Sequence, residues 1–228
     1  MEKLESIAEQ IRTSFDTQMT ARDQALNRAR ALTRACALSI RAVHRDETDV
    51  MQAHLDEARQ LAGALRADLM DYPALYYAGY TQDSLKEFAE ASISCALIRH
   101  EPLPTPTELD LPPHTYLNGL AESVGEMRRR CLDMLRQDNF TEAERLLRYM
   151  DDIFSILVTM DYPDAITNGL RRQTDVIRAI IERTRGDVTF SLRGEKLENS
   201  ISRLSRHLPG TGQLPPPSRP AQSPQEEG

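Results

Sequence analysis

The sequence predicts an all-α fold, a single bundle of about seven helices followed by a proline-rich tail. Three observations lead to this prediction. Eleven of the thirteen prolines lie in two places, five between Pro102 and Pro113 and six between Pro209 and Pro224, and only Pro73 and Pro163 stand elsewhere. The intervals between them are rich in Ala, Leu, Arg, Glu and Met, which are good helix formers. The alternation of Val, Ile, Thr and aromatic residues that marks β-strands is nearly absent.

The first half of the chain predicts three helices. Residues 2–45 contain no Pro or Gly, and their apolar residues recur at helical spacing, so they form one long helix or two in series. Residues 46–49 break the pattern and start a second helix, about 50–70, which ends before Pro73. A third helix spans about 74–99, and residues 100–114 form a proline-rich connection.

The second half predicts four more helices, at about 115–137, 141–160, 165–185 and 188–207. Asp138-Asn139 separates the first two, Asp161-Tyr162-Pro163 stops the next, and Gly186-Asp187 separates the last two. Beyond residue 207 the composition changes to Pro, Gly, Ser and Gln, which bury too little apolar surface to fold. We therefore predict one helical domain over residues 1–207 and a disordered tail over residues 208–228.

Composition narrows the class of protein. The formal net charge of −7 argues against a generally basic nucleic-acid-binding surface, but it leaves room for a local basic groove. The three cysteines have no metal-binding spacing, and they are typical of core residues in a reduced, cytoplasmic protein. The N-terminus is charged, and no run of about 18 apolar residues occurs, so neither a signal segment nor a membrane span is expected.

Two glutamates stand at the start of an apolar run in the third predicted helix. Glu87 and Glu90 are three residues apart, so their carboxylates share one helix face, and only Glu90 is charged between Phe88 and Ile98. Like charges beside a buried helix are costly unless a cation or a proton neutralises them. No arginine is in register with them, and Lys86 is expected to point elsewhere. The alternative is that this end of the helix frays and both glutamates are solvated.

Other acids occur in similar positions. Glu122 and Glu126 stand at i and i+4 in the fourth predicted helix, and Asp152 precedes the uncharged end of the fifth. If Glu87, Glu90 and Asp152 converged across the bundle, they would make an all-oxygen site that suits Mg²⁺ or Mn²⁺. Such a site can activate water and stabilise the oxygens of a phosphodiester under attack. Phosphate-binding glycine loops, Gly-x-Ser-x-Gly motifs and paired zinc-binding histidines are absent from the sequence.

The first predicted helix also carries a row of arginines opposite its apolar face, which could follow a phosphate backbone. They are Arg22, Arg28, Arg30, Arg34, Arg41 and Arg45. For each residue taken singly, an ordinary solvated arginine is the alternative.

Three stretches resemble the translin family. The first has Arg30, Thr33, Ile40 and His44-Arg45 at the spacing of the family's Ser-Arg-Asp-Ile-Thr…Ile-x-x-x-His-Arg pattern. The second, similar to Asp-Tyr-Leu-Leu-Gly-Val…Gly-Glu-Leu-x-Arg, comprises residues 115–120, Gly125-Glu126-Met127 and Arg129. The third, Asp152-Ile153-Phe154-Ser155, resembles Asp-Gly-Phe-Ser. Thr115, Asn118 and Ile153 depart from these patterns. The resemblance covers about residues 15–207.

The resemblance is closer to the translin-associated factor X branch than to translin itself. That branch has Glu-Tyr-Val-Glu-Ala where this chain has Glu87-Phe88-Ala89-Glu90-Ala91, whereas inactive translin has an uncharged run there. The resemblance implies that Glu87, Glu90 and Asp152 are catalytic metal ligands, with Glu126 as a fourth. It further implies Mg²⁺-dependent cutting of single-stranded RNA inside a hollow octamer, which we expect this chain to build as a homo-oligomer. From the row on the first predicted helix, the candidates for guiding the RNA are Arg30, Arg34, Arg41 and Arg45.

Two other classes of function remain open at this point. One is a translin-like shell that holds single-stranded DNA or RNA without cutting it. The other is a helical scaffold that binds no nucleic acid, which fits the net charge but leaves the paired acids without a role.

Overall fold

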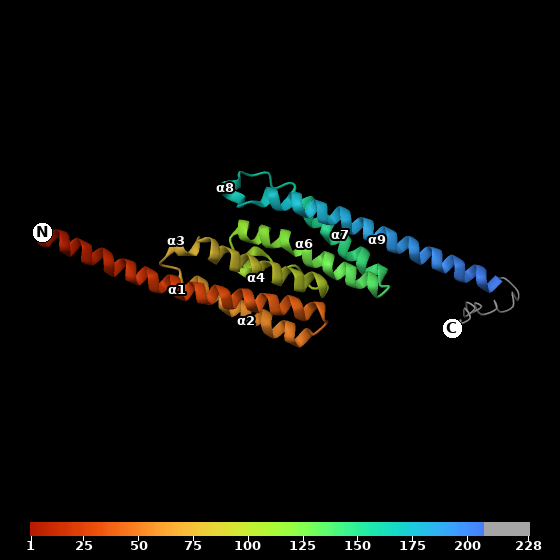
Figure 1. Ribbon diagram of the computed structural model, residues 1–228, viewed down its shortest axis with the longest axis horizontal. Coiled ribbons are helices and arrows are strands. Elements are labelled where there is room, and N and C mark those ends of the chain that lie inside the picture. The colour runs from red at the N-terminus through yellow and green to blue at the C-terminus, as the bar shows by residue number, and fades with distance from the viewer. Residues whose placement is uncertain (208–228) are drawn as a thin grey trace, which may run out of the picture. The chain divides into compact units, whose positions relative to one another are not determined.

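The computed structural model describes residues 1–207, and this part of the chain is helical with no β-strand (Figure 1). This confirms the predicted all-α class. Six helices exceed one turn: α1 (Glu2–His44), α2 (Thr48–Asp68), α4 (Gly79–Ile98), α6 (Pro113–Arg136), α7 (Phe140–Leu157) and α9 (Leu170–His207). Three single turns join them, α3 (Pro73–Tyr76), α5 (Pro106–Leu109) and α8 (Asp164–Thr167). The predicted disordered tail, residues 208–228, lies outside the described residues.

The predicted break at Gly186-Asp187 is wrong, because α9 runs through it without interruption. Glycine costs about 1 kcal/mol in a helix interior, but the neighbouring residues are fixed by tertiary contacts. Thr184 and Val188 are buried on one face. Arg128 of α6 donates to Thr184 Oγ1 at 2.8 Å and pairs with Asp187 Oδ2 at 2.9 Å. These contacts outweigh the local preference of glycine to end the helix.

The third predicted helix is divided into α3 and α4, because Ala78 adopts an extended conformation with ψ 146°. The interruption leaves backbone carbonyls without helical partners, and side chains from the first turn of α4 satisfy them. Thr81 Oγ1 donates to the carbonyl of Leu75, and Gln82 Nε2 donates to that of Tyr76, each at 2.8 Å. Two polar side chains therefore satisfy the carbonyl groups at the break, and apolar periodicity alone does not identify either of them.

The described contacts fall into two units, Met1–Thr189 and a second that begins at Phe190, so the prediction of one domain over residues 1–207 stays a prediction. In the first unit, α1 packs against α2 and α4, α4 packs against α6, and α6 packs against α7. Thirteen of the twenty residues of α4 are buried, because α1 and α6 cover it from two sides. This confirms that the helix with the paired glutamates lies in the core.

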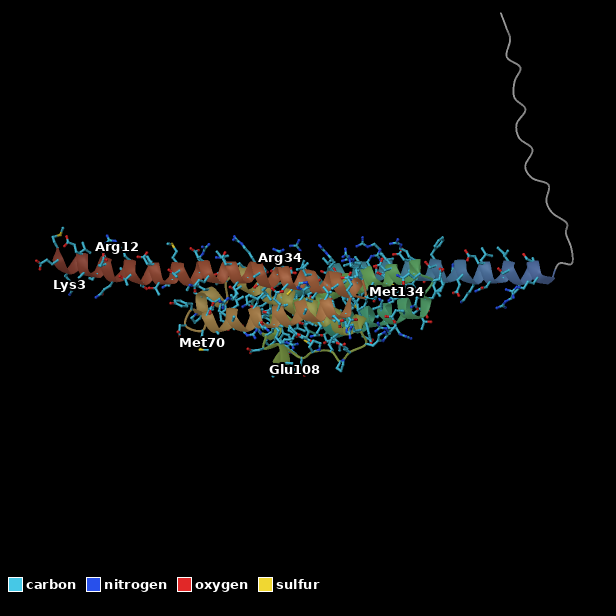
Figure 2. The ribbon with its side chains drawn as sticks, turned by 90° about the horizontal axis from the view of Figure 1, so that it is seen from below. Lys3, Arg12, Arg34, Met70, Glu108 and Met134 are labelled. Atoms are coloured by element: carbon cyan, nitrogen blue, oxygen red, sulfur yellow. The ribbon has the colours of Figure 1, made fainter. Side chains whose placement is uncertain are left out.

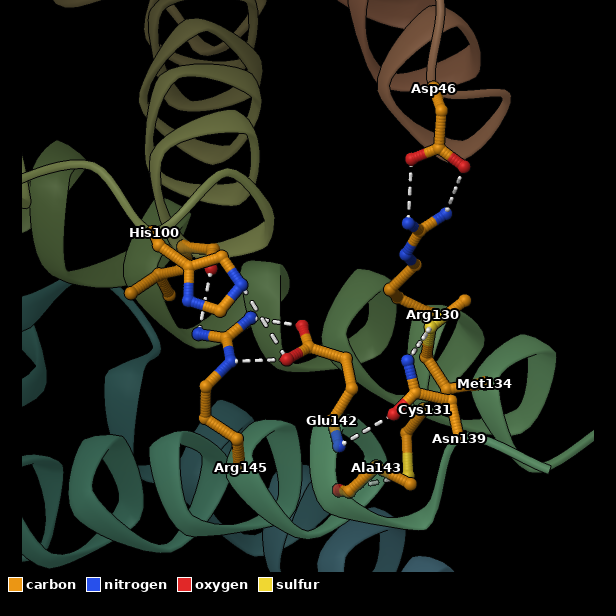
Figure 3. Close-up of polar contacts among 10 residues, drawn as sticks. Asp46, His100, Arg130, Cys131, Met134, Asn139, Glu142, Ala143 and Arg145 are labelled. Carbon is orange, nitrogen blue, oxygen red and sulfur yellow. Dashed lines mark hydrogen bonds and ion pairs between the residues drawn. The ribbon is translucent and has the colours of Figure 1, made fainter. Parts of the chain in front are cut away.

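Polar contacts fix the ends of the helices on α6 (Figure 3). Arg130 of α6 binds Asp46, just after α1, with Nη2 to Oδ1 at 2.6 Å. Asn139 caps α7, because its Oδ1 accepts from the backbone nitrogen of Glu142 at 3.2 Å. One turn later, Glu142 pairs with Arg145. Arg130 therefore holds the C-terminal end of α1 against α6. Cys131 Sγ of α6 lies 3.5 Å from the carbonyl oxygen of Ala143 and joins the start of α7 to the same helix.

The cysteines fulfil their predicted role, since Cys36, Cys95 and Cys131 are all buried and free. Within residues 1–207, no helix combines the length and apolar character needed to cross a membrane.

Candidate metal centre

Three glutamates converge where α4 meets α6. Glu87 and Glu90 of α4 and Glu122 of α6 each offer one carboxylate oxygen, and these oxygens all lie within 4.8 Å of one another. All three residues are partly buried. Glu87 and Glu90 share one face of α4 because they are three residues apart, as predicted from the sequence. Glu122 completes the group from the neighbouring helix. We call these three residues the carboxylate cluster.

Gly119 allows α6 to approach α4 closely beside the carboxylate cluster. A Cβ atom at this position would lie 2.5 Å from Ala89 Cβ, 2.8 Å from the carbonyl oxygen of Lys86 and 3.0 Å from the backbone nitrogen of Glu90. Such distances are too short for any side chain. Since Glu122 follows Gly119 by three residues, the close approach of the two helices also brings Glu122 to the glutamates of α4.

Two donors bind the same oxygen of Glu122. Lys86 Nζ lies 2.8 Å from Oε1, and Gln173 Nε2 of α9 donates to it at 3.1 Å. The prediction that Lys86 points away from the acids is therefore wrong. Asp83 and Glu90 are in register with it on its own helix, but its hydrogen-bond partner in the structure comes from α6 across the interface. The Lys86 ammonium also lowers the pKa of Glu87 and Glu90, although by less than other effects raise it.

Two of the three acids in the carboxylate cluster have raised pKa values. Burial, followed by the charges of Glu87, Glu122 and Glu126, raises the pKa of Glu90 to about 8. Burial and the charge of Glu122 likewise raise the pKa of Glu87. In the ion-free protein at neutral pH, Glu90 therefore retains its proton in most molecules. Perturbed groups that face one another in this way are typical of functional sites.

Glu126, one turn beyond Glu122 on α6, makes an ion pair beside the cluster. His44 Nε2 lies 2.5 Å from Glu126 Oε2, and Arg129 Nη1 lies 3.5 Å from the same oxygen. The hydrogen bond with His44 is the main cause of the lowered pKa of Glu126. The His44 side chain is only 3% exposed, and its Nδ1 is buried without a hydrogen-bond partner. Helix α1 therefore holds Glu126 in one orientation close to Glu90.

Helix α1 covers the same region with a thiol. Cys36 is fully buried, and burial together with the charges of Glu87 and Glu90 raises the pKa of its thiol. This electrostatic effect places Cys36 near the carboxylate cluster. An un-ionised thiol at neutral pH is a poor ligand for hard cations, so the oxygen atoms dominate the chemistry of the site.

Asp152, which the sequence analysis expected at this site, is exposed on α7 and is not a member of the carboxylate cluster. Helix α7 turns Met150, Ile153 and Leu157 toward the core, which leaves Asp152 on another face. Its role as a ligand, like that of Glu126, stays a prediction. Glu122 was noted in the sequence only through its spacing from Glu126. Its spacing from Glu126, in a predicted helix with many apolar residues, was the only feature of the sequence that pointed to Glu122.

The arginines proposed to guide nucleic acid all lie on one side of α1. Arg30, Arg34, Arg41 and Arg45 are exposed, and at 100° per residue they fall within a narrow sector of the helix surface (Arg34 is labelled in Figure 2). We call them the arginine row. Arg28, in contrast, pairs with Asp68 of α2 at 2.6 Å and belongs to the packing between these helices.

The chemistry of the carboxylate cluster fits a hard divalent cation. Each side chain provides oxygen, which Mg²⁺ and Mn²⁺ prefer, and no imidazole or thiolate in the cluster would favour zinc or copper. Burial is the main cause of the raised pKa values of Glu87 and Glu90, and the charges of the neighbouring glutamates add to it despite the opposing charge of Lys86. A divalent ion would remove the remaining repulsion.

Comparison with known proteins places this arrangement in a family. No protein-family model matches the chain. An uncharacterised protein of Methanocaldococcus jannaschii is 33% identical over 188 residues, which are 81% of this chain and 82% of that protein. The structure of AfC3PO with duplex RNA superposes with a TM-score of 0.76 at 30% identity, and the match covers 82% of this chain and 96% of that one. C3PO complexes are of the translin type. The chain belongs to the translin family.

Two further structures agree with the translin fold. A crystal structure of AfC3PO gives a TM-score of 0.76 at 29% identity, over 82% of this chain and 97% of that one. Apo-NeC3PO gives 0.74 at 18% identity, over 80% and 96% of the two chains, and shows the fold alone. The translin-type motifs meet around the site: His44 from the first stretch binds Glu126 from the second, and Gly119 lies beside Glu90.

Proposed function

We propose that this translin-family protein is a Mg²⁺-dependent endoribonuclease of the translin-associated factor X type. The observation that supports this proposal best is the carboxylate cluster of Glu87, Glu90 and Glu122 in the core of the bundle. Inactive translin, by the resemblance described above, has an uncharged run where Glu87 and Glu90 stand. Burying acids in this way opposes folding, so their presence favours a role in chemistry over a solvated face.

In the proposed mechanism, Glu87, Glu90 and Glu122 would hold one or two Mg²⁺ or Mn²⁺ ions. A bound ion would lower the pKa of its water and neutralise charge on the scissile phosphate. Gln173 donates to Glu122 and keeps that carboxylate oriented. We propose Glu126 as a fourth acid, which His44 and Arg129 hold in a fixed orientation beside Glu90. Contacts behind the ligands commonly change metal affinity or activity by 10–100-fold.

The proposed substrate is RNA, for two reasons. The AfC3PO relative was solved with duplex RNA, and this chain shares its fold at 30% identity. In addition, the arginine row runs along α1, the helix whose Cys36 and His44 reach the acids of the site. We propose that the row guides single-stranded RNA toward the carboxylate cluster. Because the AfC3PO complex holds duplex RNA, both forms belong in the assay, together with single-stranded DNA.

Assembly belongs to the same proposal. The family resemblance implies a homo-oligomeric shell, and the octamer inferred from the sequence stays a prediction.

Cutting of single-stranded RNA should require both the metal and the cluster. Pure protein with labelled RNA should release internal fragments in Mg²⁺ and none in EDTA. Glu122→Gln should reduce the rate by at least about a hundredfold, because it replaces an anionic ligand with a neutral amide of the same shape. Circular dichroism should show that its helices are retained. Gel analysis of end-labelled RNA checks the rate and distinguishes internal from terminal cutting.

Asp152→Asn separates the two ligand sets. Full activity in this variant, with loss in Glu122→Gln, would assign the site to the carboxylate cluster. Loss in Asp152→Asn with full activity in Glu122→Gln would support the ligand set expected from the sequence. RNA binding without cutting under every metal condition would favour the alternative, a non-catalytic translin-like binding protein, and cutting that persists in EDTA would exclude the metal mechanism.

The arginine row should determine how RNA binding depends on salt. Each lost phosphate contact should reduce the slope of log Kd against log salt by about 0.7, the value for single strands. We expect Arg34→Gln with Arg41→Gln to flatten the slope and weaken binding. Arg59→Gln, an exposed arginine on α2, is the control and should change neither. Fluorescence anisotropy between low and moderate salt measures the slope. Equal slopes for wild type and the double variant would exclude these two arginines from the interface.

A further inference from the structure

Lys86 stands between two anionic groups. On one side its Nζ lies 2.8 Å from Oε1 of Glu122, a member of the carboxylate cluster. On the other side it lines a polar cavity of about 90 Å³, together with Asp83, Gln173 and four other polar residues. The side chain is 22% exposed, so its stem is held by packing while its ammonium borders open space. Because Asp83 precedes Lys86 by three residues on α4, it lies within reach of the same ammonium.

We infer that Lys86 competes with the divalent ion for Glu122. When the ion binds, the Lys86 ammonium leaves Glu122 and pairs with Asp83 instead. This inference rests on the proposed metal centre and concerns how that centre is kept without its ion. In the ion-free protein, the ammonium neutralises part of the charge of the carboxylate cluster. Binding of the ion makes that ammonium a like charge beside a double positive charge.

Glu122 is already occupied in the ion-free protein. Its Oε1 accepts from both Lys86 and Gln173, so this oxygen is already bound by two donors. Gln173 is neutral and can remain when an ion shares the carboxylate. Lys86 carries a full charge, and like charges a few ångströms apart near a protein surface repel each other strongly. The repulsion doubles for a divalent ion, so the lysine is the donor that has to leave.

Asp83 offers the displaced ammonium a second acidic partner. Asp83 is exposed, lines the same cavity and interacts electrostatically with Lys86 in the ion-free protein. A rotation of the lysine side chain about its stem brings Nζ from Glu122 toward Asp83 without moving the helix backbone. The exchange therefore replaces one acidic partner with another, and this limits the free energy that the ion has to supply.

Magnesium titration by calorimetry tests the exchange, on the full chain at about pH 9, where protons compete little for the glutamates. Lys86→Met keeps the length of the side chain and removes its charge, so it should bind Mg²⁺ at least tenfold more tightly than wild type. Asp83→Asn should weaken binding several-fold, because the displaced ammonium loses its acceptor. In the Lys86→Met background, Asp83→Asn should have almost no effect, which gives a coupling in the double-mutant cycle. Lys196→Met, an exposed lysine on α9, is the matched control and should bind like wild type.

Thermal melts of the ion-free proteins confirm that each variant folds, and Lys86→Met should melt lower in EDTA because three acids then face one another without a cation. If wild type binds Mg²⁺ and Lys86→Met binds it equally or more weakly, the exchange is overturned and the metal centre stands. If Asp83→Asn weakens Mg²⁺ binding equally in wild type and in the Lys86→Met background, the two substitutions are not coupled and the exchange is overturned in the same way. No Mg²⁺ binding by either protein would instead overturn the metal centre itself, and the exchange with it.

Discussion

Gly119→Ala should destabilise the protein and disrupt the carboxylate cluster at the same time. The added methyl group would lie 2.8 Å from the carbonyl oxygen of Lys86 and 3.0 Å from the backbone nitrogen of Glu90. Neither atom can rotate away as a side chain could, so α4 and α6 have to separate. Overpacking of this kind typically costs about 1–3 kcal/mol, or roughly 2–12 °C in a domain of this size.

The functional loss should exceed the loss of stability. The backbone atoms that would be displaced belong to Lys86 and Glu90, and Glu122 lies one turn along α6 from the substitution. A shift of about 1 Å at such a site can reduce a catalytic rate by about a hundredfold. We therefore expect Gly119→Ala to lose RNA cutting at temperatures where circular dichroism still shows a folded protein. Thermal melts and cleavage assays at about 20 °C below the melting temperature measure the two effects separately.

Gly125→Ala is the matched control on the same helix. A Cβ atom at Gly125 would meet nothing within 4 Å, so the substitution should gain helix propensity of up to about 1 kcal/mol and retain activity. If the two alanine variants melted at the same temperature and cut RNA equally well, Gly119 would not determine the spacing of α4 and α6.

The sequence predicted most of the helices and two of the three acids of the carboxylate cluster, for identifiable reasons. Apolar periodicity located α4, and Glu87 and Glu90 were noticeable because they interrupt or precede an apolar run. Glu122 could not be selected in the same way. Its place beside Glu90 depends on how α6 is aligned against α4, and Gly119 fixes that alignment through contacts between helices. Periodicity describes each helix separately and contains no information on this alignment.

The other differences have the same origin. Gly186 reads locally as a break, but Arg128 of α6 holds Thr184 and Asp187 on either side of it. Lys86 forms its ion pair with Glu122 on α6 and not with an acid of its own helix. Asp152 lies on a face of α7 away from its buried residues, so it is outside the carboxylate cluster, and its role as a ligand stays a prediction. In each case a contact between helices outweighed a preference within one helix.

Glu90→Gln should stabilise the ion-free protein, and the gain should grow as the pH rises. The pKa of Glu90 is raised to about 8 in the folded protein from an ordinary value of 4.5. Between these two values the folded state retains a proton that the unfolded state has released. The stabilisation that this proton provides is complete below pH 4.5 and is lost as the pH rises through 8. Wild-type protein in EDTA should therefore melt at progressively lower temperature over this range.

Glutamine resembles the protonated glutamate and does not ionise, so the melting temperature of Glu90→Gln should depend less on pH. Near pH 8 its advantage in free energy of unfolding should be about 2 kcal/mol, and near pH 5 it should almost vanish. Mg²⁺ should then raise the melting temperature of wild type by mass action and that of Glu90→Gln much less, since the variant lacks a ligand. Scanning calorimetry at several pH values, with EDTA or Mg²⁺, measures both effects. Parallel pH profiles and equal shifts with Mg²⁺ in the two proteins would mean that Glu90 is a solvated surface acid. Converging profiles at low pH, with a Mg²⁺ shift confined to wild type, would mean that the same carboxylate destabilises the empty site and binds the ion.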